Sequence, residues 1–173
     1  TREWPGSVSG IAVCQSSHPM AVIEVGVGWR SLSLVSALRR ARAGDTIQVP
    51  DGWRHEEGIR LTVPITLRAA GPSAVINGAV EIETDATLEG LTIVASAGPG
   101  IVISRSVNVL ISGCAVEAKG YAISVGHSSR VRIEGARVTS FTANGLYVFE
   151  RADVVASNCQ ISSTQSVAVS LGT

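Results

Sequence analysis

A short pattern recurs four times in the second half of this chain, in steps of 22 or 23 residues. The four copies are TLEGLTI (Thr87–Ile93), LISGCAV (Leu110–Val116), RIEGARV (Arg132–Val138) and VASNCQI (Val155–Ile161). A period of this length is typical of stacked supersecondary units, none of which can bury its apolar face alone. The repeat therefore predicts a solenoid.

Each period contains three short stretches in which apolar residues alternate with other residues, as expected for strands that bury one face. Ile101 and Ile103, for example, recur as Ile123 and Val125. One corner position accepts a left-handed backbone, and its occupants in successive copies are Gly90, Gly113, Gly135 and Asn158. These features predict an all-β fold, a right-handed parallel β-helix of about five coils with three strands in each.

Residues 31–43 (SLSLVSALRRARA) are predicted to form a helix that begins at Ser31 or Ser33 and ends at Gly44. Its apolar face would be formed by Leu32, Val35, Leu38 and Ala41. We expect this helix to cap the solenoid, because a terminal coil otherwise exposes apolar side chains and free strand edges.

The sequence divides into an N-terminal strand or cap segment, residues 1–30, and a β-helix domain, residues 31–173, that includes the capping helix. Strand-like stretches at 11–14 and 21–27 would join the cap or form an extra edge. By the repeat, the sequence stops within a coil. We therefore expect that the natural protein continues, or that this open coil packs on another copy or on a partner.

Charge and cysteine content restrict the partners. A net charge of zero argues against nucleic acid, and no apolar run is long enough for a membrane span. Cys114 and Cys159 occupy equivalent positions two coils apart, about 10 Å by strand spacing, which is too far for a disulfide. We expect buried, reduced thiols and, from them, a cytoplasmic protein.

The outward positions of the predicted coils show no cluster of acidic residues, so we predict no catalytic residue, no metal site and no cofactor. One weak polar candidate remains, because Arg105, His127 and Glu150 stack at one turn. A histidine between a cation and a carboxylate could transfer a proton, and the alternative is a solvated charge ladder. Arg130 and Asp153 are expected to form a surface ion pair.

The stretch from Ala37 to Gly78 resembles the beginning of right-handed parallel β-helix proteins of the pectate-lyase-like superfamily. The matching residues are Gly44-Asp45-Thr46-Ile47, Val49, Gly52 and Ile65-Thr66-Leu67. The resemblance implies the fold, but this superfamily includes lyases, hydrolases, epimerases and non-catalytic modules. More loosely, the composition resembles bacterial β-helix domains fused to AAA-type ATPases, which implies an intracellular recognition or scaffold module.

We therefore expect a non-catalytic binding or scaffold module, part of a larger protein, that binds a protein partner or self-associates through its open C-terminal coil. The outward apolar residues Val102, Leu110 and Val155 would form part of the interaction surface. The alternative is a carbohydrate-active or carbohydrate-binding domain, in which Tyr147 or Trp53 stacks on sugar. For Trp53, covering the edge of the core is a further alternative.

Overall fold

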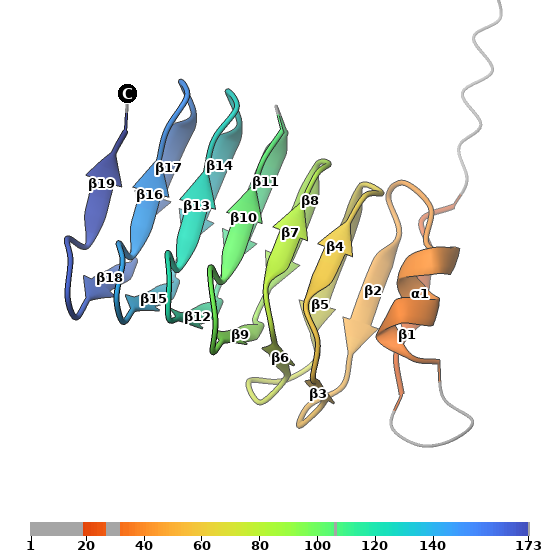
Figure 1. Ribbon diagram of the computed structural model, residues 1–173. Helices are drawn as coiled ribbons and strands as arrows, with labels where there is room; N and C mark the ends of the chain where they lie inside the picture. The colour runs from red at the N-terminus through yellow and green to blue at the C-terminus, as the bar shows by residue number, and fades with distance from the viewer. Residues whose placement is uncertain (1–18, 27–31, 106, 173) are drawn as a thin grey trace, which may run out of the picture.

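The computed structural model describes residues 19–26, 32–105 and 107–172, and within them the chain forms one helix and 19 strands. Figure 1 shows the strands as successive rungs of one stack, with helix α1 at its N-terminal end and β19 at the other. All strand pairs are parallel, and they join strands of neighbouring coils in register. The structure is the parallel β-helix that the repeat predicts.

The strands form three sheets, which we call A, B and C. Sheet A has the order β1 (Val22–Glu24), β2 (Thr46–Val49), β5 (Ile65–Ala69), β8 (Ala86–Glu89), β11 (Asn108–Ser112), β14 (Arg130–Glu134) and β17 (Asp153–Ser157). Sheet B has the order β3 (Arg54–His55), β6 (Val75–Asn77), β9 (Thr92–Ala95), β12 (Ala115–Ala118), β15 (Arg137–Ser140) and β18 (Gln160–Ser163). Sheet C has the order β4 (Ile59–Leu61), β7 (Val80–Ile82), β10 (Ile101–Ile103), β13 (Ile123–Val125), β16 (Leu146–Val148) and β19 (Val169–Leu171).

The described residues contain six coils of three strands, and β1 adds a seventh strand to sheet A. The prediction of about five coils is therefore too low. The sequence DGWRHEEG, which looks like a polar loop leaving the stack, contains β3, which pairs with β6 through Arg54 and His55. A strand of only two residues cannot show the alternation of apolar and other residues that marks the later strands. This explains why the first coil could not be recognised from the sequence.

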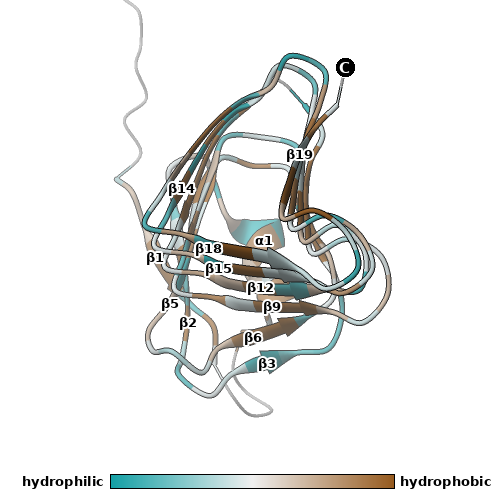
Figure 2. Ribbon diagram, turned by 90° about the vertical axis from the view of Figure 1, so that its left-hand side faces the viewer, coloured by the Kyte–Doolittle hydropathy of each residue, from teal (hydrophilic) through white to brown (hydrophobic). Residues whose placement is uncertain are grey.

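The core is a set of columns of aliphatic side chains inside the three sheets. In sheet A one column contains Ile47, Leu67, Leu88, Ile111 and Ile133, each fully buried and in register with the next. Figure 2 looks along the stack and shows the strands of each sheet lying over one another around one interior. Burying each such side chain is worth about 1.5–3 kcal/mol, so the columns supply most of the stabilisation.

The corner after each of the last four sheet A strands holds a left-handed residue, as predicted. The φ angles are +66° at Gly90, +60° at Gly113, +59° at Gly135 and +54° at Asn158. At Gly113 the backbone N–H donates to the Glu134 carbonyl of the next coil at 2.8 Å, and Gly135 donates to Ser157 in the same way at 3.0 Å. The corner therefore continues the hydrogen bonding between coils.

Helix α1 (Leu34–Arg40) is shorter than predicted. Ser33 caps it by accepting a hydrogen bond from the Ser36 N–H at 3.2 Å, whereas Ser31 lies outside the described residues. The helix ends at Ala41, before Gly44, because Ala41 is extended and the Asp45 carboxylate accepts the Arg42 N–H at 2.8 Å.

The buried face of α1 also differs from the prediction. Leu34 and Ala37 are buried, whereas Val35 is 40% exposed, so the inclusion of Val35 was wrong. Leu32, Leu38 and Ala41 do pack against the core, as expected. Of the two strand-like stretches predicted before the helix, 21–27 contains β1, which pairs with β2 at the edge of sheet A, and 11–14 lies outside the described residues.

Neighbouring coils lie close together just before the strands of sheet C. The residues there are all small: Gly58, Ala79, Gly100, Ala122, Gly145 and Ala168. A Cβ on Gly100 would lie 2.7 Å from the Ala122 carbonyl oxygen and 2.7 Å from Val116 Cγ1, closer than real Cβ atoms come. Glycine at this position is therefore required by packing.

We predict that Gly100→Ala destabilises the protein by about 1–3 kcal/mol, because neither the Ala122 carbonyl nor the Val116 methyl can move away freely. Gly113→Asn is the matched control, since Asn158 already occupies the equivalent corner with a left-handed backbone. Urea unfolding followed by circular dichroism measures both. Equal midpoints for the two variants would contradict this account of the close approach.

Candidate functional site

Outward side chains form rows along the stack, because the strands of each sheet pair in register about 4.8 Å apart. On sheet A, the central outward row is Thr46, Thr66, Thr87, Leu110, Arg132 and Val155. Three polar residues in the first coils thus give way to an apolar residue, an arginine and a second apolar residue. The predicted binding residues Leu110 and Val155 therefore share one face.

A groove of about 720 Å³ runs along this outer face of sheet A. It is lined by Gly44, Pro64, Ile65, Thr66, Asp85, Ala86, Thr87, Asn108, Val109, Leu110, Arg130, Val131, Arg132, Asp153 and Val155. Val155 is 56% exposed, although a solvated sheet face normally carries polar residues there.

Charged and amide side chains form one rim of the groove, at the start of the sheet A strands. Asp85 accepts hydrogen bonds from the Asn108 backbone N–H at 2.7 Å and from its side-chain amide at 3.3 Å. Arg130 and Asp153 are cross-strand neighbours, but no ion pair joins them, contrary to the prediction. The rim therefore presents one cation and one carboxylate of adjacent coils to solvent.

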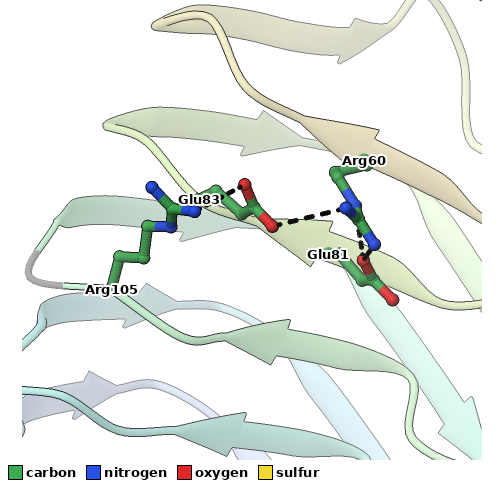
Figure 3. A network of polar contacts seen from close by, with 4 residues as sticks. All are labelled: Arg60, Glu81, Glu83 and Arg105. Atoms are coloured by element: carbon green, nitrogen blue, oxygen red, sulfur yellow. Dashed lines mark hydrogen bonds and ion pairs between the residues drawn. The ribbon is translucent and has the colours of Figure 1, made fainter.

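Sheet C carries Val102 on its outer face, next to a network of charges (Figure 3). Arg60 contacts Glu81 at 2.7 Å and Glu83 at 3.7 Å, and Arg105 contacts Glu83 at 3.4 Å. The arginines are well exposed, so each pair is worth at most about 1 kcal/mol. Within this network Arg105 pairs with Glu83, which belongs to the preceding coil.

His127 and Glu150 are the two members of the polar trio that the structure brings together, with Nδ1 2.7 Å from the Glu150 carboxylate. Arg105 faces Glu83 instead, so the three residues do not form one relay. Both His127 and Glu150 adopt a positive φ at equivalent corners of adjacent coils. With both side chains about half exposed, the pair is a solvated contact between coils.

An aromatic cluster on sheet C surrounds Tyr147. Its ring stacks on Tyr121 at 4.8 Å and on Phe149 at 5.2 Å, while His127 meets Phe149 edge-on at 6.1 Å. This cluster was not predicted from the sequence, although Tyr147 and Phe149 are two residues apart and so share a strand face. Gly126 makes room for it, since a Cβ there would lie 2.4 Å from the Phe149 ring.

The five predicted binding residues do not form one surface. Leu110 and Val155 line the sheet A groove, whereas Val102 and Tyr147 lie on sheet C. Trp53 is only 5% exposed and stacks on His55 with ring centroids 5.6 Å apart. For Trp53 the structure therefore favours the core-edge role over sugar stacking.

No three His, Cys, Asp or Glu side chains in the described ranges are grouped so that they could hold a metal ion. In the same ranges, no helix has the length and apolarity needed to cross a membrane.

Cys114 is a buried thiol between the coils. Its Sγ donates to the Ser112 carbonyl at 3.4 Å and to the Leu88 carbonyl at 3.6 Å. Burial raises the pKa of the Cys114 thiol to about 11, and backbone hydrogen bonds only partly offset this effect. Cys159, at the equivalent position in the last coil, is half-buried, and both thiols are free.

Comparison with known proteins identifies the family. A family model of the right handed beta helix region matches residues 74–173, which is more than half of the chain. The chain therefore belongs to the right-handed β-helix family, which confirms the predicted fold and its hand. Searches of curated proteins and of solved structures found no match.

We predict that Cys114 resists alkylation by iodoacetamide in the native protein at pH 8, because a pKa of about 11 leaves on the order of one thiol in a thousand ionised. Cys159 is the internal control, since it is more exposed and should react first. Peptide mapping by mass spectrometry, with and without urea, measures both. Native labelling of Cys114 as fast as labelling in urea would contradict the prediction.

Proposed function

We propose that this protein is a non-catalytic binding module and that the sheet A groove docks a protein partner. The observation that carries the proposal is the presence of Leu110 and Val155 on an outward row, inside a groove with a charged rim. Protein interfaces combine an apolar centre with a polar rim in this way. Solitary exposed apolar residues are common, but these two line one concave surface.

The spacing of the two residues suggests the shape of the partner. Leu110 and Val155 belong to β11 and β17, two coils apart, which is about 10 Å by strand spacing. Two turns of an α-helix span about 10.8 Å, so apolar residues two turns apart on an amphipathic helix would each meet one of them. An acidic residue between them would face Arg132, whose Nε contacts the Glu134 carboxylate at 2.6 Å, and would compete with Glu134 for it.

The carboxylates of the groove support a non-catalytic role. Asp85 immediately precedes β8 and Asp153 is the first residue of β17, three coils away, which is about 14 Å by strand spacing. Paired carboxylates in glycosidases lie within about 9.5 Å of one another. The groove therefore lacks the pair of acids that hydrolysis of a sugar chain requires, within the residues that line it.

A carbohydrate-binding or carbohydrate-active role is the second candidate, and the aromatic cluster around Tyr147 favours it. Aromatic rings at a surface commonly bind sugars, and Tyr121 in this cluster is exposed. However, Tyr147 already stacks on Tyr121 and Phe149, which uses ring faces that a sugar would need. We therefore rank this role below protein binding. The likeness to pectate-lyase-like proteins remains a prediction.

We also propose a cytoplasmic scaffold that self-associates through its last coil. The free thiols of Cys114 and Cys159 support a reducing compartment. In the described residues of the last coil, Val169 and Leu171 occupy inward positions but are 48% and 78% exposed. A second copy of this chain could bury them by extending the apolar columns.

We predict that Leu110→Glu weakens binding of groove ligands at least tenfold, because the carboxylate would lose hydration against an apolar partner side chain. The ligands are clones selected from a helical-peptide display library on the wild-type protein. Val94→Glu is the matched control, since Val94 is outward on sheet B. Affinities are measured by biolayer interferometry. Clones that bind both variants equally well would place the binding surface elsewhere.

We predict that the wild-type protein forms dimers as its concentration rises, and that Leu171→Arg keeps it monomeric. An arginine on the exposed inward column would oppose stacking of a second copy. Ser170→Arg is the control, because Ser170 pairs with Tyr147 on the outward row. Light scattering over a concentration series gives the mass, and a wild-type monomer throughout would contradict self-association.

A further inference from the structure

Sheet C begins at β4, and no described strand pairs with β4 on its N-terminal side. Helix α1 lies at the same end of the stack (Figure 1). Between α1 and β4 there is a second groove, of about 320 Å³. Its wall on the helix side includes Val35, Leu38, Arg39 and Ala41, and its other wall is the continuous run from Gly58 to Val63.

The backbone of β4 offers unused hydrogen-bonding groups to this groove. The Ile59 N–H donates to the Ala79 carbonyl at 2.8 Å, and the Leu61 carbonyl accepts the Glu83 N–H at 3.0 Å. Backbone groups of successive residues in a paired strand point to opposite sides, so those of Arg60 point away from β7. Within the described chain no backbone group pairs with them. An edge of this kind is a template for another strand.

The charge of the groove indicates which strand it would accept. Arg39 and Arg60 line it, and no acidic residue does. Arg60 already contacts Glu81, whereas Arg39 makes no ion pair among the described residues. Val35 adds an apolar side chain that is 40% exposed beside Arg39. The groove thus combines a free strand edge, an apolar wall and an unpaired cation.

We propose that the α1–β4 groove binds an extended acidic peptide of a partner protein, which adds a strand to sheet C. Its backbone would pair with the N–H and C=O groups of Arg60, and its carboxylate would contact the Arg39 guanidinium. Strand addition at a sheet edge beside a helix takes its affinity from main-chain hydrogen bonds and its specificity from side-chain pockets. This site is separate from the sheet A groove and does not depend on it.

The test uses a fluorescent peptide, Thr-Val-Glu-Val-Thr, and a copy that is N-methylated at alternate residues so that it cannot pair as a strand. Binding is measured by fluorescence anisotropy. We expect Arg39→Glu to weaken binding of the parent peptide at least tenfold. Arg40→Glu is the matched control, because Arg40 is the next residue of the helix and does not line the groove. Amide exchange of Arg60 should slow at least tenfold in saturating peptide.

Four results would each overturn the proposal. Equal losses in Arg39→Glu and Arg40→Glu would mean that only overall charge attracts the peptide. Equal affinity for the N-methylated copy, or unchanged exchange at Arg60, would exclude strand addition. No binding of the parent peptide at millimolar concentration would show that the groove is not a peptide-binding site. Circular dichroism of both variants checks that any loss of binding is not caused by unfolding.

Discussion

The stacking of inward aliphatic side chains between coils is the interaction on which the rest of this structure depends. No coil can bury its own inward residues, because three short strands enclose only one layer of side chains. Each coil is covered by its neighbours, as in the column through Leu88 and Ile111. In the last described coil, which has a described neighbour on one side only, the same inward positions are exposed, as at Val169 and Leu171.

This stacking also fixes where the outward residues lie. Because the inward side chains of successive coils stay in register, the outward side chains of the same strands stay in register too. Residues 22 or 23 positions apart in the sequence therefore become neighbours on the outer face. The sheet A groove arises from this rule, because Leu110, Arg132 and Val155 are consecutive members of one row. At the N-terminal end of sheet C the rule stops, because no described strand pairs with β4 on that side, and helix α1 lies across a groove from it.

The repeating part of the fold was predictable from the sequence, and the irregular part was less so. The corner occupied by Gly90 and Asn158 follows from residue type alone, because few other residues accept a left-handed backbone. Strand β3 has too few residues to show alternation. The ion pair between Arg105 and Glu83 was not predicted. Glu83 follows a strand of an early coil, and the sequence of that coil does not contain the pattern that recurs in the second half of the chain. Val35 was wrongly predicted to lie on the buried face of helix α1, where the structure has Leu34.

The central claim is that the outward row on sheet A forms the surface that docks a protein partner, and that the outer face of sheet C around Val102 does not. Methyl NMR spectra of the protein with a bound groove ligand test it most directly. The account predicts shifts at the methyl groups of Leu110, Val155 and Val131, with those of Val102 unchanged. Shifts centred on Val102, with Leu110 and Val155 unaffected, would contradict it.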